Sequence, residues 1–303
     1  MKLIQWTLFI DMLGYRDING SIDSDASAQE FVSFMEGNQA LLELTDAPHV
    51  KEQYRNNKEF NLYEHYDINN CFVSDSLIIT YKPKETSEPY NEKKQLMHSA
   101  NALFIIAMRL QTFIFKCYLE KGLFLRGGVS NKYCYVKDRF AVGEGLIEAY
   151  QTESSIAKYP RIVIHPAVEE NSGLMKMIDF LSDNMYGGNS ILQRDDVDGQ
   201  LFIDHIGYAI ATVNKRIPMI KAAADRNLDM YLIHLDSVKN QIQRHAEQIE
   251  KKLLELHTRI EASGNDQASR SVLESVVKKF EWLKKYHNTK VQANPWLKGR
   301  LVA

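Results

Sequence analysis

The chain has 303 residues and a formal net charge of −2, with 45% apolar and 25% charged residues. This balance supplies a full hydrophobic core and argues against a dedicated nucleic-acid binder. No unbroken apolar run approaches the ~20 residues of a membrane span, and the N-terminus lacks signal-peptide features, so we expect no membrane attachment. The three cysteines have no zinc-site spacing and fit reduced thiols in the cytoplasm.

The first apolar stretch of the sequence ends on an acidic residue. Residues 3–11 predict a strand, because Trp6, Leu8, Phe9 and Ile10 favour extended structure. The stretch ends on Asp11, and a glycine follows three residues later. A carboxylate beside a bare glycine backbone is a setting that can hold a cation and a phosphate. The alternative is a strand that simply ends on an acid before a turn.

The next segments predict a loop, a helix and an insertion. Residues 17–26 are polar and are expected to form a loop, and apolar residues recur at helical spacing from Ser27. Residues 46–61 are polar and predict a mobile insertion. The clearest helix covers residues 91–121 and ends at Gly122.

A hairpin is predicted over residues 62–82. We place its turn at Asn69-Asn70, since Asn tolerates positive φ. The second arm carries Asp75 between apolar or small neighbours. A buried unpaired carboxylate is costly, so we expect Asp75 to be paired or bound to a cation. The alternative is a capped or salt-bridged acid at a strand bulge.

Further strands and helices alternate up to residue 165. We expect a strand at 123–130 with a glycine break, a hairpin partner at 132–141, a helix at 144–157 and a strand at 161–165. This order is typical of an α+β or α/β sandwich, with one sheet covered by helices. We therefore expect a catalytic domain over residues 1–202.

The last third, residues 203–303, predicts a helical C-terminal extension. Apolar residues between Ile242 and Ile260 alternate spacings of four and three, as in a heptad seam. A turn at 262–267 and a second helix at 269–287 complete a helical hairpin. The hairpin either packs on its own sheet domain or serves as a dimerisation arm.

The two acidic residues, Asp11 and Asp75, suggest one shared cation site. If the strands of Asp11 and Asp75 are neighbours, both carboxylates meet at one spot. Paired carboxylates suit Mg²⁺ or Mn²⁺, which in turn hold a nucleoside triphosphate.

The order of these segments resembles the class III nucleotidyl cyclases. Residues 9–15 resemble the family's first-strand motif, and Asp75 stands where that family has its second metal-binding Asp, on a hairpin. Gly143, Ala149 and Glu153 match the spacing of its later helix. The fold implied is a cyclase-like α+β sheet-and-helix sandwich.

The chain resembles the Pycsar pyrimidine cyclases of bacterial anti-phage defence more closely. This likeness rests on residues 125–130, 143–153, 160–163, 196–199 and 282–288. It implies a lyase that makes a 3′,5′-cyclic nucleotide and pyrophosphate, works as a homodimer and signals to a separate effector protein activated by the cyclic nucleotide.

Three departures from the purine-using enzymes shape the substrate expectation. The positions of their transition-state Asn and Arg hold Ile147 and Gln151, and the position of their purine-selecting Lys holds Cys71. The resemblance therefore implies UTP or CTP, with UTP preferred. The alternatives are a purine cyclase that reads its base with other residues, and a non-catalytic nucleotide-binding scaffold.

The resemblance also implies roles for individual residues. Asp11, Met12 and Asp75 would hold two Mg²⁺ or Mn²⁺ ions, and Gly14 and Tyr15 would contact phosphate oxygens.

One further residue is expected to supply a positive charge, and three residues are expected to surround the base. Arg126 is expected to contact phosphate or the transition state, the alternative being an Arg that pairs with an acid. Lys132 and Arg139 are weaker substitutes for it. The expected wall around the base consists of Tyr66, Asn70 and Cys71.

Overall fold

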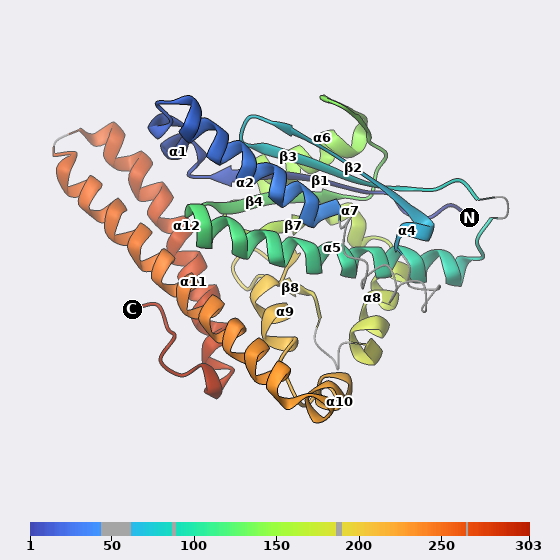
Figure 1. Cartoon of the computed structure of the whole chain (residues 1–303). Helices are drawn as coiled ribbons and strands as arrows, with labels where there is room; N and C mark the ends of the chain where they lie inside the picture. The colour runs from blue at the N-terminus through green and yellow to red at the C-terminus, as the bar shows by residue number, and fades with distance from the viewer. Residues whose placement is uncertain (44–61, 87–88, 186–189, 265) are drawn as a thin grey trace.

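The computed structural model describes residues 1–43, 62–86, 89–185, 190–264 and 266–303 (Figure 1). The insertion expected at 46–61 lies outside the described residues. Within them the chain forms a mixed sheet, helices on both of its faces and a long helical hairpin at one side.

The main sheet, over the described residues, has seven strands in the order β2-β3-β1-β4-β7-β9-β8. The β4–β7 pair is parallel and the other neighbouring pairs are antiparallel. The strands are β1 (Trp6–Leu13), β2 (Tyr66–Val73), β3 (Ser76–Pro83), β4 (Phe124–Ser130), β7 (Ile162–Ile164), β8 (Leu192–Arg194) and β9 (Leu201–Ile203). A separate hairpin pairs β5 (Tyr135–Lys137) with β6 (Phe140–Val142).

Helices make up most of the remaining structure. Their bounds are α1 (Tyr15–Ser21), α2 (Asp25–Glu43), α4 (Leu62–His65), α5 (Glu92–Lys121), α6 (Glu144–Gln151), α7 (Pro166–Glu169), α8 (Ser172–Met185), α9 (His205–Ala211), α10 (Pro218–Arg226), α11 (Leu228–Ala262) and α12 (Gln267–Gln292). A π-helical turn, η2 (Thr152–Ile156), continues α6, and a 3₁₀ turn, η3 (Pro295–Leu297), follows α12. The expected α+β sheet-and-helix arrangement with a C-terminal helical hairpin is confirmed.

The central strand β1 separates the two faces of the sheet. Its side chains alternate, so that Leu8, Ile10 and Met12 are buried in the main core. Trp6 lies on the same face and donates from Nε1 to the carbonyl of Ser99 in α5 (3.0 Å). The other face of β1, which carries Asp11, is covered by α6.

The helix α5 is the core helix of the domain. Gly122 ends it at φ 64, as the sequence predicts, and the side chain of Asn91 caps its first turn. Among the described helices, α5 alone has the length and hydropathy of a membrane span, and 72% of its most apolar window is buried inside the protein. That burial is typical of a core helix.

The helix α6 lies unusually close to the sheet. A Cβ built on Gly128 in β4 would stand 2.2 Å from the carbonyl oxygen of Ala149 and 2.5 Å from the Cβ of Thr152. Only glycine permits this approach. The glycine break of this strand therefore serves helix–sheet packing, and it places the start of η2 directly over β4.

Three local predictions are wrong. The stretch 132–141, expected to pair with the strand at 123–130, instead contributes to the separate β5–β6 hairpin, while β4 pairs with β1 and β7. The stretch 17–26, expected as a loop, contains most of α1 and the start of α2. The hairpin turn lies at Ser74-Asp75, because β2 pairs with β3 from Tyr66↔Pro83 to Val73↔Ser76. The eight-residue ladder outweighs the local preference of Asn69-Asn70 for a turn, and Ser74 takes the positive φ (58°) instead.

The C-terminal hairpin packs on its own sheet domain. The seam residues Ile242, Ile249 and Leu256 of α11 are buried, as predicted. Phe280 of α12 meets Phe124 of β4 edge-on, with ring centroids 5.0 Å apart. The hairpin thus contacts its own sheet domain, whereas its use as a dimerisation arm stays a prediction. The domain boundary at residue 202 also stays a prediction, and β9 crosses it.

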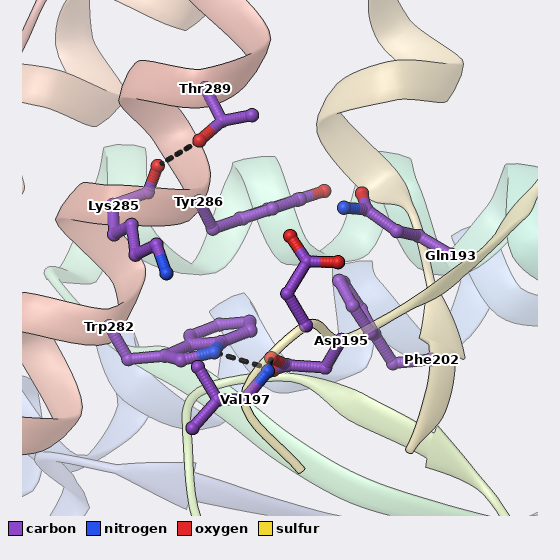
Figure 2. Close-up of a pocket in the computed structure, with 9 residues that line it drawn as sticks. Gln193, Asp195, Val197, Phe202, Trp282, Lys285, Tyr286 and Thr289 are labelled. Atoms are coloured by element: carbon purple, nitrogen blue, oxygen red, sulfur yellow. Dashed lines mark hydrogen bonds between the residues drawn. The ribbon is translucent and has the colours of Figure 1, made fainter. Parts of the chain in front are cut away.

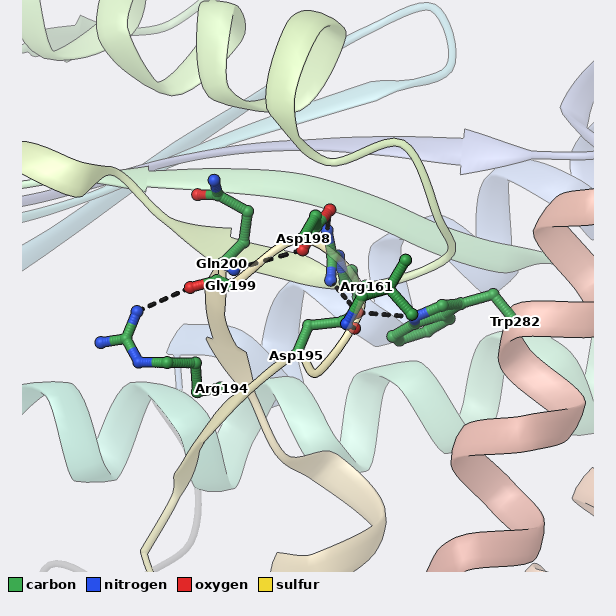
Figure 3. Close-up of polar contacts among 8 residues, drawn as sticks. Arg161, Arg194, Asp195, Asp198, Gly199, Gln200 and Trp282 are labelled. Atoms are coloured by element: carbon green, nitrogen blue, oxygen red, sulfur yellow. Dashed lines mark hydrogen bonds and ion pairs between the residues drawn. The ribbon is translucent and has the colours of Figure 1, made fainter.

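A buried cluster around Arg161 fastens α12 to the sheet. Arg161 pairs with Asp195 and Asp198, and Trp282 of α12 donates from Nε1 to Asp195 (2.6 Å; Figure 3). The Trp282 ring also stacks on Tyr159, with centroids 5.1 Å apart. This cluster fixes the register of α12 against the sheet.

A small cavity lies beside this cluster, between α12 and the β8–β9 hairpin (Figure 2). Its volume is about 40 Å³, which suits a water molecule but not a nucleotide. The cavity is therefore too small for a nucleotide.

Candidate active site

Asp11 lies on the face of β1 covered by α6, two residues before the strand ends. It pairs in register with Ser76 of β3 on one side and with Arg126 of β4 on the other. Its side chain is 19% exposed. The expectation that Asp11 ends its strand is corrected, since β1 continues to Leu13.

Asp75 stands at the tip of the β2–β3 hairpin, next to Asp11. Its carbonyl accepts a hydrogen bond from the backbone N–H of Met12 (3.0 Å), which ties the hairpin tip to β1. Asp75 is partly exposed at a turn, and does not interrupt a buried strand as the sequence suggests. The fold therefore brings the two predicted carboxylates together, although by a different hairpin register.

The electrostatics of Asp11 reflect this proximity. Burial raises the pKa of Asp11, Arg126 lowers it, and the charge of Asp75 raises it further; the net direction is upward. A cation bound beside Asp11 would offset the effects that disfavour its ionisation. The site is thus short of positive charge.

Arg126 connects Asp11 to a third acid. Its Nη2 lies 3.2 Å from Asp11 Oδ2, and its Nε donates to Glu153 Oε1 (2.5 Å). Glu153 is 3% exposed and belongs to η2. Burial raises the pKa of Glu153, while the Arg126 charge acts in the opposite direction. Arg126 therefore holds two carboxylates in place.

Lys279 of α12 adds a second cation near these acids. Its charge lowers the pKa of both Asp11 and Glu153. The pKa of Lys279 is itself lowered, first by burial and then by Arg126. The C-terminal extension thus contributes charge to a site that we expected to lie within residues 1–202.

The donor set fits a divalent ion shared with a substrate. No group of three or more His, Cys, Asp or Glu residues suited to a metal ion occurs in the described parts of the chain. Mg²⁺ commonly takes one or two carboxylates and completes its shell with water and substrate phosphates. Asp11 and Asp75 supply that minimum. The side chain of Met12 is buried in the main core, so Met12 offers only its main chain.

The predicted phosphate-binding turn follows β1 directly. Gly14 adopts φ 97 and precedes α1. Its position requires glycine, because L-residues rarely take this conformation. The ring of Tyr15 packs edge-on against Phe31 of α2, 5.6 Å between centroids, and its main chain directly follows Gly14.

The three residues expected around the base lie in different surroundings. Tyr66 is buried in the main core and donates its hydroxyl hydrogen to the carbonyl of Ile4 (3.0 Å). Cys71 is buried in a small cluster under β5, where burial raises its thiol pKa. Asn70 lines a polar pocket at the sheet edge, bounded by Lys82. The structure does not bring these residues together.

An apolar groove next to the acids is a better candidate for the base. Its volume is about 660 Å³, within the range of small-molecule sites. It borders the acid pair at Ser76, the cross-strand partner of Asp11. The lining residues are Phe9, Val73, Ser76, Ile78, Arg139, Phe140, Ala141, Leu146, Ile147, Tyr150 and Gln151.

Two members of the site were not assigned to it from the sequence. The sequence assigns Glu153 a helix spacing but no role in the site; it follows Ala149, another residue of that spacing, by one helical turn. Lys279 carries no such local signal, because most of the chain separates it from Asp11. Lys132, predicted as a substitute for Arg126, does not join these residues; its carbonyl accepts a hydrogen bond from Thr7 Oγ1 (3.0 Å).

Comparisons with known proteins give structural likenesses at low sequence identity, of which three are described. No protein-family profile and no curated protein matches the sequence. The dimeric guanylyl cyclase domain of the RhoGC fusion protein from the aquatic fungus Blastocladiella emersonii aligns at 12% identity and a TM-score of 0.35, covering 67% of this chain and 94% of that one. A monomeric double mutant of that domain aligns at 12% and 0.34, with the same coverage. The guanylyl cyclase Cya2 aligns at 12% and 0.30, covering 66% of this chain and 89% of that one.

Proposed function

We propose that the chain is a nucleotidyl cyclase that converts UTP or CTP into the 3′,5′-cyclic nucleotide and pyrophosphate. One observation carries the proposal: the fold holds Asp11 and Asp75 side by side, and the charge of Asp75 raises the pKa of Asp11. Such a pair, on a strand and a hairpin tip, is suited to divalent ions that also bind a triphosphate.

Each residue near the pair has a task in this proposal. Arg126 and Glu153 orient the Asp11 carboxylate, while the main chain at Gly14 and Tyr15 offers N–H groups to phosphate oxygens. Arg126 is itself a candidate for contact with a phosphate once Asp11 binds a cation. A bound Mg²⁺ or Mn²⁺ would supply charge neutralisation and a more acidic 3′-hydroxyl. The chain's own contribution is positioning of the reacting groups.

The base is assigned to the apolar groove. Phe9 and Tyr150, which meet edge-on at 5.3 Å, offer aromatic surface there. Gln151 and Arg139 are the polar side chains at the rim that can read hydrogen bonds. Ile147, 57% exposed, replaces the polar group that purine-using enzymes carry. These features support a pyrimidine, and we propose UTP in preference to CTP.

The active form is proposed to be a homodimer. Several large apolar side chains around the groove are exposed, which is unusual for the surface of a monomer. They are Val73, Tyr133, Tyr135, Phe140, Val142, Ile147 and Tyr150. A second copy covering this groove face would enclose the nucleotide. The resemblance to anti-phage cyclases extends the proposal to a signal read by a separate effector.

The test is a substrate survey. The purified chain is incubated with ATP, GTP, CTP or UTP and Mn²⁺, and the cyclic product and pyrophosphate are measured. The proposal expects conversion of a pyrimidine triphosphate. Conversion of ATP or GTP alone would replace the pyrimidine assignment, and nucleotide binding without turnover of any triphosphate would make the chain a non-catalytic scaffold.

A further inference from the structure

Negative side chains outnumber positive ones at the candidate site. Arg126 is already engaged by Asp11 and Glu153, and the charge of Asp75 adds to that of Asp11. A triphosphate bound here would add further negative charge. A cation that is not already committed to a carboxylate would therefore favour binding.

The face of β4 that carries Arg126 is covered by three segments in turn. Gly128 lies under α6, Arg126 pairs with Glu153 of η2, and Phe124 meets Phe280 of α12. These three β4 residues are separated by two positions each, so they point to the same face of the sheet. The helix α12 thus continues the layer that covers Asp11.

Lys279 is held in this layer by its neighbours. Phe280, the next residue, packs on Phe124, and Trp282, one turn later, is fixed by Asp195 in the Arg161 cluster (Figure 3). Both aromatic side chains are buried, so α12 has little freedom to rotate. The packing of these two aromatic residues therefore holds the half-buried Lys279 in the layer over β4, where its charge interacts with that of Arg126.

Lys279 is also uncommitted. Its charge acts on Asp11 and Glu153, yet within the described residues it forms no ion pair or hydrogen bond of its own. Lys252 of α11, in contrast, pairs with Asp17 (3.4 Å). An uncommitted, partly desolvated ammonium beside an acidic metal site is suited to a polyphosphate.

We propose that Lys279 binds the polyphosphate of the substrate and that the C-terminal hairpin is therefore part of the active site. This inference rests on the proposed function, since it names a phosphate-binding residue for the same site. The Arg161–Asp195–Trp282 cluster acts as the positioning device for Lys279. The recognised chemistry is a metal-bound chain of phosphates, whichever base it carries.

The experiment measures binding of inorganic tripolyphosphate with Mg²⁺ by isothermal titration calorimetry. Wild type is compared with Lys279→Met, Lys279→Arg and the exposed neighbour Lys278→Met. We expect Lys279→Met to weaken binding about tenfold or more, as for loss of a charge-assisted hydrogen bond. Lys279→Arg should retain most of the affinity, and Lys278→Met should match wild type. Lys279→Gln replaces Lys279→Met if the latter does not fold.

The outcomes separate this inference from the proposed function. Tripolyphosphate binding that depends on Lys279, without turnover of any triphosphate, supports the inference and contradicts the cyclase proposal. Turnover with equal tripolyphosphate affinity in wild type and Lys279→Met overturns the inference alone. Absence of tripolyphosphate binding by the wild type overturns it as well.

Discussion

Asp11 and Arg126 are cross-strand partners of β1 and β4, and their side chains form an ion pair of 3.2 Å. The same guanidinium holds the buried Glu153. Arg126 therefore restrains one of the two carboxylates on which the proposed chemistry depends. The pKa of Asp11 is nevertheless raised, because burial and the charge of Asp75 outweigh the opposing charges of Arg126 and Lys279.

The coupling of the two acids is directly measurable. Replacing Asp75 by Asn removes a charge that raises the pKa of Asp11, so this pKa should fall. Carboxyl-carbon NMR titration of Asp11 in wild type and Asp75→Asn checks the shift. Asp67→Asn, on the exposed part of β2, is the matched control. An unchanged or higher pKa in Asp75→Asn would contradict the placement of the two acids.

Packing of α6 against β4 predicts a strong effect at one glycine. Gly128→Ala should destabilise the fold by about 1–3 kcal/mol, because the added Cβ meets the Ala149 carbonyl oxygen at 2.2 Å. Gly20→Ala in α1, with nothing within 4 Å, should change stability by less than about 1 kcal/mol. Chemical denaturation measures both. Equal stability of the two variants would show that α6 does not lie this close.

Some elements of the fold can be predicted from the sequence, and others cannot. The strand of Asp11, the helix α5 with its end at Gly122 and the C-terminal seam follow from local periodicity and end signals. The β2–β3 turn does not, because ladder pairing over the whole hairpin moves it from Asn69-Asn70 to Ser74-Asp75. Local preference is a weaker determinant than cross-strand pairing.

The sequence likewise predicts only part of the candidate site. Asp11 and Asp75 could be predicted because each follows a recognisable pattern in its own segment. Lys279 could not, since only the docking of α12 through Phe280 and Trp282 brings it near. Tyr66 was misplaced as a base contact because strand alternation sends it into the core.

Buried His205 predicts loss of stability in acid. Burial lowers its pKa from 6.5 to about 4, and its Nε2 has no hydrogen-bond partner among the described residues. Between these values the unfolded chain binds more protons, so the stabilisation is complete above pH 6.5 and declines as the pH falls. At about 1.4 kcal/mol for each pKa unit, roughly 3 kcal/mol is lost by pH 4.

Urea denaturation between pH 7 and pH 4.5 tests this prediction. His205→Phe should show a shallower decline in the free energy of unfolding than wild type. The exposed His257→Gln in α11 should follow the wild-type curve. A decline in His205→Phe as steep as in wild type would assign the acid sensitivity to other groups.

The apolar groove face predicts self-association. Phe140 is 74% exposed at the groove, and Phe140→Asp should disrupt a dimer that buries it. Phe180→Asp, an exposed site on α8, is the matched control and should leave the dimer intact. Light scattering coupled to gel filtration gives the masses. A wild type that remains monomeric at high concentration, with nucleotide present, would contradict the dimer proposal.

The central claim is that Asp11 and Asp75 together support triphosphate cyclisation. The most direct measurement compares the initial rate of pyrophosphate release from UTP with Mn²⁺ in wild type, Asp75→Asn and Asp67→Asn, each verified as folded by circular dichroism. The account predicts turnover by wild type and Asp67→Asn, and a loss on the order of 100-fold or more in Asp75→Asn. Turnover by Asp75→Asn at the wild-type rate, or none by the folded wild type with any of the four triphosphates, would contradict it.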